Sequence, residues 1–339
     1  MNISLSSIAR RCAVVSVVTI VAVGLAACSS GAVGASKTGK ESTPESAGTI
    51  LIMNQPAGNP FADLVFSGLQ RLQKEKGIPA KQVPGVQAGA YEQQLRSAAS
   101  NGFNPVMVLW DDLGNAVGKV APDFPKTKFI IVDSTVDPHL KNVQTLTIDT
   151  LKPAYLAGVV GAHLSKTGKL GFVGGQDMGV VNDYGCGFKA GVKAAAPSDS
   201  VTTTYAGTFT DPLKGQQIAA SLKGDGVDVI LQAANQTGLG VLKGAAQNGI
   251  IGIGSDSWQG DIAKGSVPWS ALKDAGTAAY QVAKNVVDNK FKAGMYVYDA
   301  EKGAPLFDKR DLDALTPDLQ ATVKEIEAEL RAGTIHVSC

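Results

Sequence analysis

Polar and aromatic side chains follow several short apolar runs of this sequence, and such groups could together bind a small molecule. They stand at four places: Trp110-Asp111-Asp112, Asp133-Ser134, Gln232 with Asn235-Gln236, and Ser255-Asp256-Ser257-Trp258. A carboxylate can accept two hydroxyl hydrogen bonds at once, and an aromatic face can stack on a flat ring. In open α/β sheets, ligands bind outside the carboxyl ends of strands. If the apolar runs are strands, these side chains predict one binding cleft.

The apolar runs alternate with longer amphipathic segments along the chain. The runs predict strands at Thr49–Met53, Val106–Leu109, Phe129–Val132, Leu170–Val173, Val227–Leu231 and Ile250–Ile253. The amphipathic segments predict helices at Tyr91–Ala99, Pro153–Leu164, Phe188–Ala196, Lys214–Lys223, Gly240–Gln247, Gly276–Val287 and Pro317–Ala332. Another helix should begin at Pro60, with Asn59 as its N-cap. Strands that alternate with helices indicate parallel sheets covered on both faces.

Two sheets in two lobes are the arrangement that we expect. The alternation is too long for a single sheet of five or six strands, although an eight-stranded barrel has the same local pattern. Polar groups at the strand ends favour two lobes whose carboxyl ends face each other across a cleft. The length of the chain agrees with two lobes. About 312 of the 339 residues would remain after loss of a leader, which is enough for two lobes of roughly 130–150 residues each.

The N-terminal segment predicts where the protein works. Arg10 and Arg11 precede an apolar run over 13–27, and Leu25-Ala26-Ala27-Cys28 resembles a bacterial lipobox. We therefore expect residues 1–27 to be a lipoprotein signal peptide, Cys28 to carry the lipid and residues 28–47 to be a flexible tether. The alternative is a plain signal peptide, or an uncleaved anchor with a chance cysteine. Our prediction is a chain anchored by lipid to the extracytoplasmic face of the cell membrane.

Charge and histidine content exclude several classes of function. Lys and Arg number 31 and Asp and Glu number 30, and the leader contains two arginines, so the mature net charge is close to −1. Such a balance gives no electrostatic reason to expect nucleic acid as a partner. His139, His163 and His336 form neither a metal-ligand spacing nor the order of a catalytic triad. We therefore expect no metal, no cofactor and no enzymatic activity.

Two cysteines, Cys186 and Cys339, remain besides Cys28 and the leader's Cys12. Outside the cytoplasm such a pair can oxidise to a disulfide. The alternative is a buried free thiol and a frayed terminal one. Both possibilities stay open, because sequence alone does not show that the two residues meet.

The stretch Lys166-Thr167-Gly168-Lys169-Leu170-Gly171-Phe172-Val173-Gly174-Gly175 closely resembles the central signature of the basic membrane protein family of ABC-transporter receptors. That family includes bacterial purine nucleoside receptors. Further matches in the family's order are Phe129-Ile130-Ile131-Val132-Asp133, Leu156-Ala157-Gly158, Gly187-Phe188-Lys189-Ala190-Gly191, Gly207-Thr208-Phe209-Thr210-Asp211-Pro212, Ile253-Gly254-Ser255-Asp256 and Leu272-Lys273-Asp274-Ala275-Gly276. Together they span almost the whole mature chain.

The resemblance implies an α/β fold of the type I periplasmic-binding-protein kind. This fold has two doubly wound parallel-sheet lobes, joined by three crossings, with a ligand cleft between them. On this chain we expect an N-terminal lobe of residues 48–148 plus 275–299 and a C-terminal lobe of residues 149–274 plus 300–339. The resemblance also implies a monomer that binds a nucleoside-like small molecule and delivers it to ABC permease subunits.

The family's nucleoside receptors hold the base between phenylalanines and the ribose with an acid and a lysine. The matching residues are Phe61, Phe209, Asp256 and Lys273. The full set of candidate ligand contacts is Asn59, Phe61, Trp110, Asp112, Asn115, Phe209, Asn235, Asp256, Trp258 and Lys273. We expect a neutral ligand with a flat ring and vicinal hydroxyls, most simply a purine nucleoside, and no free phosphate.

This chain departs from the family at the base end of the site. Relatives carry acids shortly before the first phenylalanine, whereas Gln55–Pro60 contains none. A second ribose-binding acid falls near Asn115, unless Asp112 takes that place. Trp258 replaces an acid beside Asp256, and Trp110 replaces a smaller residue. The base could therefore differ from a purine, and a free nucleobase or a sugar is an alternative ligand.

Two other functions stay open. The same fold serves in signalling, so the chain could be a ligand-sensing or surface lipoprotein without a transporter. Neighbouring permease and ATPase genes would favour transport. A surface nucleoside hydrolase is the third possibility, but it would need a metal-binding acid cluster or a positioned base that the sequence does not display.

Overall fold

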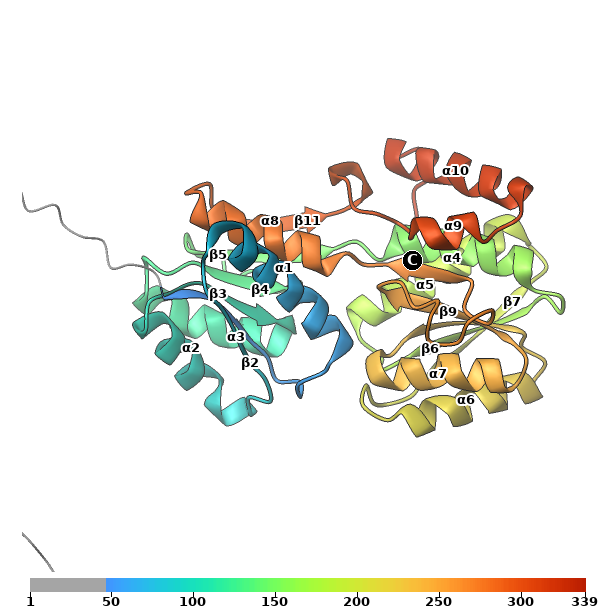
Figure 1. Ribbon diagram of the computed structural model, residues 1–339, viewed down its shortest axis with the longest axis horizontal. Helices are drawn as coiled ribbons and strands as arrows, with labels where there is room; N and C mark the ends of the chain where they lie inside the picture. Colours follow the sequence, from blue (N-terminus) through green and yellow to red (C-terminus); the bar gives the residue numbers. More distant parts are fainter. Residues whose placement is uncertain (1–46) are drawn as a thin grey trace, which may run out of the picture. The chain divides into compact units, whose positions relative to one another are not determined.

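The computed structural model describes residues 47–339, and the statements below concern this part of the chain. The expected signal peptide, Cys28 and the tether as far as residue 46 lie outside the described residues. Strands and helices alternate through the described part and form two parallel sheets, each with helices on both faces (Figure 1). The predicted two-lobe α/β architecture is therefore confirmed, and the eight-stranded barrel is excluded.

The first sheet has six parallel strands in the order β11-β5-β4-β3-β1-β2. Their bounds are β1 (Gly48–Ile52), β2 (Ala80–Val83), β3 (Phe103–Leu109), β4 (Phe129–Val132), β5 (Val143–Ile148) and β11 (Gly294–Tyr298). The helices that cover it are α1 (Pro60–Lys76), α8 (Ala275–Val287), α2 (Tyr91–Ser100) and α3 (Trp110–Val120). Leu51 belongs to the core with α1 and α8, whereas Ile50 and Ile52 belong to the core with α2 and α3. Burial on both faces explains why the central strands are continuously apolar.

The second sheet has five parallel strands in the order β10-β9-β8-β6-β7. Their bounds are β6 (Lys169–Gly174), β7 (Ser200–Tyr205), β8 (Val229–Ala233), β9 (Ile251–Asp256) and β10 (Trp269–Leu272). Its helices are α4 (Leu151–Leu164), α5 (Gly179–Ala195), α6 (Pro212–Gly224), α7 (Asn235–Gln247), α9 (Lys309–Asp313) and α10 (Pro317–Ala332). Phe172 packs in the core with α4, α5 and α10, and the next residue, Val173, packs with α6 and α7. The second sheet is thus also covered on both faces.

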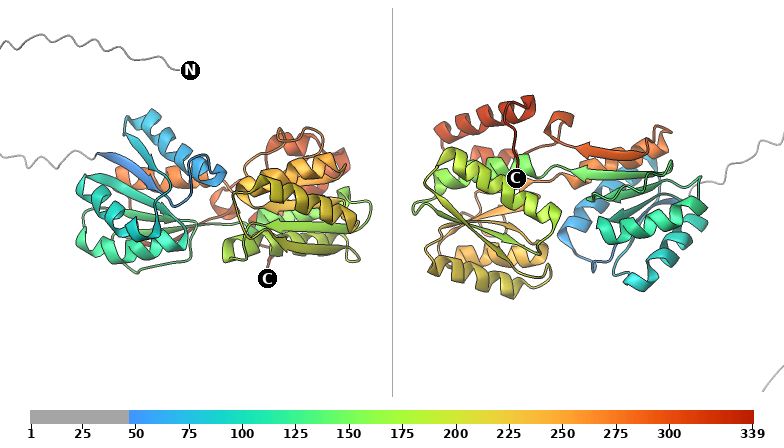
Figure 2. Two further views of the ribbon diagram at one scale, coloured as in Figure 1. Left: turned by 90° about the horizontal axis from the view of Figure 1, so that it is seen from below. Right: turned by 180° about the vertical axis from the view of Figure 1, so that it is seen from behind.

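The chain passes between the two sheets three times within residues 47–339. The crossings are 149–150 between β5 and α4, 273–274 between β10 and α8, and 299–308 between β11 and α9. Figure 2 shows these connections from two further sides. Residues far apart in sequence can therefore meet where the two sheets face each other.

Cys186 and Cys339 form a disulfide, with an Sγ–Sγ distance of 2.00 Å and a Cα–Cα distance of 5.6 Å. The Cα separation lies within the usual range for a disulfide. Cys186 is in α5, so the bond attaches residue 339 to a helix of the second sheet.

Some elements differ from those predicted. Five strands were not predicted: β2, β5, β7, β10 and β11. Four of these, β2, β7, β10 and β11, are the edges of the two sheets, where a strand needs fewer apolar residues to be stable. Trp110, which follows the predicted strand Val106–Leu109, is the start of α3, and α5 begins at Gly179 rather than near Phe188.

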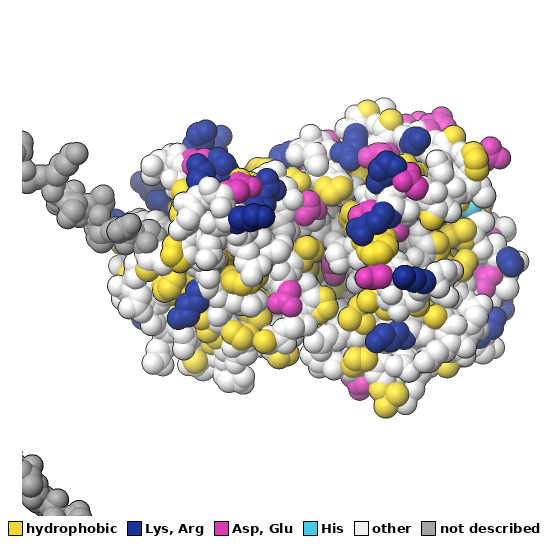
Figure 3. Space-filling view, viewed as in Figure 1, with side chains coloured by type: hydrophobic (Ala, Val, Ile, Leu, Met, Phe, Trp, Pro, Cys, Tyr) yellow, Lys and Arg dark blue, Asp and Glu magenta, His cyan; other side chains and the backbone are white. Residues whose placement is uncertain are grey.

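In the described part of the chain, none of the helices combines the length and the apolar character that crossing a bilayer requires. On the face seen in Figure 3, basic and acidic side chains are interspersed over both sheets' helices.

Candidate functional site

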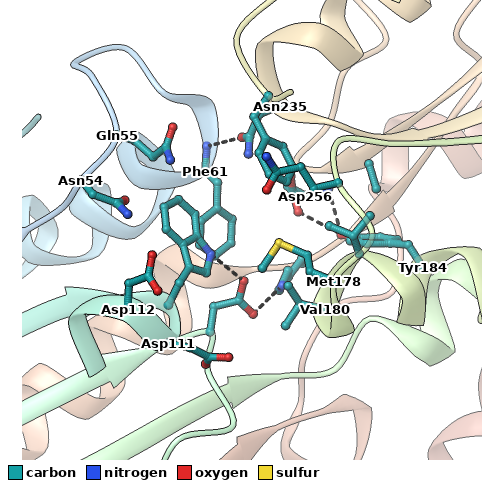
Figure 4. Close-up of a pocket in the computed structure, with 17 residues that line it drawn as sticks. Asn54, Gln55, Phe61, Asp111, Asp112, Met178, Val180, Tyr184, Asn235 and Asp256 are labelled. Atoms are coloured by element: carbon teal, nitrogen blue, oxygen red, sulfur yellow. Dashed lines mark hydrogen bonds and ion pairs between the residues drawn. The ribbon is translucent and has the colours of Figure 1, made fainter. Parts of the chain in front are cut away.

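A cavity of about 330 Å³ lies where the carboxyl ends of the two sheets face each other. This volume is in the range of small-molecule sites. Figure 4 shows Asn54, Gln55, Phe61 and Asp112 on one side of it and Met178, Tyr184, Asn235 and Asp256 on the other. The complete lining is Asn54, Gln55, Phe61, Trp110, Asp111, Asp112, Asp133, Gln176, Met178, Val180, Val181, Tyr184, Phe209, Ala233, Asn235, Asp256 and Lys273.

Four of the lining residues have left-handed backbone conformations although none is a glycine. They are Trp110 with φ 61°, Asp133 with φ 59°, Asn235 with φ 50° and Asp256 with φ 65°. Each stands at or just beyond the carboxyl end of a strand: β3, β4, β8 and β9 respectively. This conformation costs about 1–2 kcal/mol for a residue with a Cβ, and such strain concentrates at functional sites. The backbone therefore identifies the same strand ends as the sequence did.

Phe61 and Trp110 form a stacked aromatic pair on the first-sheet side. Their ring centroids are 5.8 Å apart, with an angle of 27° between the planes. Asn59 places Phe61, because its Oδ1 accepts a hydrogen bond from the Ala62 amide at 3.0 Å and Pro60 follows as the first residue of α1. The predicted capping is confirmed. It fixes Phe61 in the first turn of the helix, at the cavity wall.

A buried ion pair lies beside these rings. Lys273 Nζ is 2.6 Å from Asp133 Oδ1, and both side chains are 3% exposed. The Trp110 indole N–H donates to Asp133 Oδ2 at 3.3 Å. Lys273 Nζ also lies 5.1 Å from the centre of the Phe61 ring. We expected Lys273 to act together with Asp256, but its ionic partner in the structure is Asp133, from the end of β4.

Asp256 is held by Tyr184 of α5. The tyrosine hydroxyl donates to Asp256 Oδ1 at 3.0 Å and accepts from the Asp256 amide at 3.2 Å. Burial raises the pKa of Asp256, while the charge of Lys273 and the hydrogen bond from Tyr184 act against that rise. Burial, followed by the charge of Asp256, also raises the pKa of Tyr184 well above its ordinary value. The tyrosine therefore stays a neutral donor to the carboxylate.

Phe209 lines the cavity from the second-sheet side, and its place depends on Gly175. A Cβ at residue 175 would lie 2.1 Å from Phe209 Cε1, so a larger residue there would displace the ring. The Phe209 carbonyl accepts a hydrogen bond from the Thr237 amide at 3.2 Å. Gly175, which directly follows β6, thus provides the surface on which the ring lies.

The structure brings together seven of the ten candidate ligand contacts: Phe61, Trp110, Asp112, Phe209, Asn235, Asp256 and Lys273. The other three lie elsewhere. Asn59 is buried as the cap of α1, and Asn115 is exposed on α3. The Trp258 indole N–H donates to Asp311 Oδ1 at 2.9 Å, and the guanidinium of Arg310 lies 3.7 Å from the centre of its ring. These partners place Trp258 against α9 rather than in the lining.

Several lining residues were not proposed as ligand contacts from the sequence. Asp111 and Asp133 stand among the polar strand ends noted there, and Asn54 directly precedes the segment without acids. Gln176 follows β6 in the same way, and this spacing could have identified it. The residues from Met178 to Tyr184 gave no such signal, because four glycines in α5 interrupt the apolar pattern of the helix.

This chain is similar to several known proteins. A family model described as "ABC transporter substrate-binding protein PnrA-like" matches residues 48–338. The "ABC transporter nucleoside-binding protein BmpA" of Lactococcus lactis is 31% identical over 322 residues, which cover 88% of this chain and 91% of that protein. The "CD4+ T-cell-stimulating antigen" of Listeria innocua is 29% identical over 335 residues, covering 91% of this chain and 93% of that protein.

Among solved structures, a solute-binding protein of an ABC transporter system from Aeropyrum pernix K1 is similar with a TM-score of 0.75. It is 21% identical, and the match covers 85% of this chain and 92% of that one. This likeness concerns the fold, and it confirms the predicted periplasmic-binding architecture.

Proposed function

Because this chain belongs to the family of PnrA-like ABC-transporter substrate-binding proteins, we propose that it is a lipid-anchored receptor that binds a nucleoside and delivers it to an ABC importer. Members of this family are extracytoplasmic binding proteins, not enzymes. That the ligand is a nucleoside and that the chain is anchored by lipid are proposals that go beyond membership of the family. The first is argued from the cavity, and the second from the lipobox at Cys28.

The observation that carries the proposal is the joint lining of the cavity by aromatic rings and carboxylates from both sheets. Phe61 and Trp110 come from the first-sheet side, and Phe209 comes from the second. Stacking on such rings is worth about 1–3 kcal/mol per base and tolerates different bases. A flat heterocycle between the two sides would thus contact both.

We assign the binding of the ribose hydroxyls to carboxylates on opposite sides of the cavity. Asp112 lies in the first turn of α3, and Asp256 ends β9. Asp256 Oδ1 already accepts from Tyr184, whereas Oδ2 has its nearest donor, the Ser255 hydroxyl, at 3.5 Å. A ribose diol could donate to both carboxylates, and hydrogen bonds to charged groups contribute about 1.5–3 kcal/mol each. Such a ligand stabilises the closed arrangement, since it contacts both lobes.

We assign the binding of the nucleoside base to Asn54 and Gln55. Asn54 Oδ1 is buried and has no hydrogen-bond partner among the described residues. A buried acceptor without a donor is unfavourable, so an N–H of the bound base would complete it. Amide side chains both donate and accept, unlike the acids that nucleoside-binding relatives carry before the first phenylalanine. This end of the cavity therefore suits pyrimidine as well as purine nucleosides.

We also propose that residues 48–148 with 275–299 and residues 149–274 with 300–339 move as two lobes about the three crossings. The crossings are short at 149–150 and 273–274, which suits a hinge. Small-angle X-ray scattering with and without a bound nucleoside tests this point. A smaller radius of gyration with ligand is expected, and superimposable profiles would remove the hinge.

Mass spectrometry of small molecules released from the purified protein tests the ligand class. Calorimetry with adenosine, guanosine, inosine, uridine and cytidine then gives affinities, with the matching monophosphates as controls. We expect binding of nucleosides and no heat from monophosphates. If every nucleoside and nucleobase fails while an amino acid or an aliphatic sugar binds, the proposal is wrong. Nucleoside uptake by cells that lack the gene separates transport from sensing, because a sensor's loss would leave uptake intact.

A further inference from the structure

The charged side chains of the cavity are strongly unbalanced. Four aspartates line it: Asp111, Asp112, Asp133 and Asp256. Among the described residues of the lining, Lys273 is the only cationic side chain. From Asp256 and Lys273 alone, we expected a neutral ligand. The structure adds Asp111 and Asp133 to the lining, and the formal charge of the lining becomes −3.

Lys273 does not offset the aspartates that face the ligand space, because it is already paired. Its ammonium is 2.6 Å from Asp133, and both side chains are 3% exposed. The pair is therefore a neutral unit within the wall. Three carboxylates remain, those of Asp111, Asp112 and Asp256.

The three remaining carboxylates differ in how far the protein satisfies them. Asp111 Oδ1 accepts from the Ser134 hydroxyl at 2.5 Å, and Asp256 Oδ1 accepts from the Tyr184 hydroxyl at 3.0 Å. These donors are neutral, so they leave the negative charges in place. Asp112 has no hydrogen-bond or ionic partner among the described residues, and it lies on the same side of the cavity as Phe61 (Figure 4).

The aromatic pair adds a second reason for a positive ligand. Aromatic faces carry negative electrostatic potential and attract cations. The ammonium of Lys273 already lies 5.1 Å from the centre of the Phe61 ring, and Trp110 stacks on Phe61. The indole N–H of Trp110 is used by Asp133, so the ring offers the ligand its faces rather than its donor. The amides of Asn54 and Gln55 are neutral and place no positive charge near the ring. A cationic ring would thus meet aromatic faces and carboxylates together.

We infer that the cavity prefers nucleosides whose heterocycle is itself a cation, such as N-ribosyl pyridinium compounds, over neutral nucleosides. The inference rests on the proposed function, since it needs the ribose and ring to occupy this cavity. It narrows that function to a ligand class: a flat aromatic cation joined to a diol. The free Asn54 Oδ1 would accept from a carboxamide substituent on such a ring.

Nicotinamide riboside and its reduced 1,4-dihydro form test the inference, because they share the ribose and the carboxamide but only the first has a cationic, aromatic ring. Variants of Asp112 separate the effect of the ring charge from that of stacking. Calorimetry should show the cationic form binding about 10-fold or more tightly. Asp112→Asn should lower the ratio of the two affinities by about 5-fold, and Asp112→Glu should restore it. Asp123→Asn, outside the lining and paired with Arg96, is the control and should leave the ratio as it is.

The ratio is measured within each variant, so a loss of folded protein affects both ligands alike. Equal affinities, or tighter binding of the reduced form, would overturn the charge preference while uridine or inosine binding kept the proposed function intact. An unchanged ratio in Asp112→Asn would also overturn it. If neither form and no neutral nucleoside binds, the proposed function itself has failed, and the inference falls with it.

Discussion

The backbone amide of Phe61 donates a hydrogen bond to the side-chain Oδ1 of Asn235 at 3.3 Å, across 174 residues of sequence. Phe61 lies in the first turn of α1 on the first sheet, and Asn235 is the first residue of α7 on the second. Gln236 Nε2 adds a second bond of this kind, to the Gly58 carbonyl at 3.1 Å. The helix start that carries a cavity ring is thus joined directly to the opposite lobe.

Replacing Asn235 by Ala should weaken ligand binding, because closure of the lobes would lose this hydrogen bond. A typical net value of about 0.5–1.5 kcal/mol corresponds to roughly 2- to 12-fold in affinity. Asn235→Asp keeps an acceptor oxygen and should lose less ligand affinity than Asn235→Ala. Calorimetry measures both. Asn248→Ala, at the far end of α7, is the matched control, and an effect as large as that of Asn235→Ala would contradict the explanation.

Gly175→Ala should impair binding with little change in the rest of the second lobe, because the added Cβ would displace Phe209. The expected loss is about 1–3 kcal/mol, the value of one stacked base. Gly179→Ala is the control, since a Cβ at that position meets nothing within 4 Å. Equal affinities for the two variants would show that Phe209 does not stack on the ligand.

Asp256→Ala should cost about 2–3 kcal/mol of nucleoside affinity, or roughly 30- to 150-fold, because it removes the charged acceptor for a ribose hydroxyl. Asp256→Asn keeps the acceptor for Tyr184 and isolates the loss of charge. The measurement is calorimetry with the tightest nucleoside and its 2′-deoxy analogue. A penalty for Asp256→Ala as large with the deoxy analogue as with the nucleoside would argue against a role in binding the diol.

The stability of the chain should depend on pH through Asp311. Burial is the main cause that raises its pKa from 3.8 to about 6, opposed by the hydrogen bond from Trp258. The folded state therefore holds the proton more tightly than the unfolded state. The stabilising contribution of protonated Asp311 is complete below about pH 3.8 and is lost as the pH rises through about 6. Asp311→Asn should remove that loss, which is at most about 3 kcal/mol.

Thermal unfolding at pH 5.0 and pH 7.5 checks this expectation. The increase in unfolding temperature of Asp311→Asn over the unmodified chain should be larger at pH 7.5 than at pH 5.0. Asp313→Asn, at an exposed residue paired with Lys309, should show no such difference between the two pH values. A gain that is the same at both would mean that Asp311 does not titrate as described.

Cys28→Ala should release the protein from membranes or leave its leader uncleaved, because the thiol is the proposed site of lipid attachment. Fractionation and the intact mass of the mature chain provide the readouts. Cys186→Ala serves as the control, since that residue is in the disulfide and not in the lipobox. An unaltered mass and unaltered membrane retention in Cys28→Ala would refute the anchor.

The fold was predictable because its central strands are buried on both faces, as at Leu51 and Ile52, and therefore read as apolar runs. The ends of these strands also gave most of the site, including Asp256 and Trp110. The partner of Lys273 was not predictable in this way. Its ion pair with Asp133 depends on how the crossing after β10 lies against the end of β4, and no local pattern encodes that distance. Tyr184 was missed for a similar reason, since its contact with Asp256 joins two elements of the second sheet.

The residues with left-handed backbone at the strand ends affect how the free energy of ligand binding divides between enthalpy and entropy. Trp110, Asp133, Asn235 and Asp256 already have this backbone conformation in the structure, and its cost belongs to folding. A ligand therefore does not have to order these segments. Little conformational entropy of the backbone should be lost at the strand ends on binding, and the entropic penalty should fall mainly on the closure of the lobes and on the ligand itself.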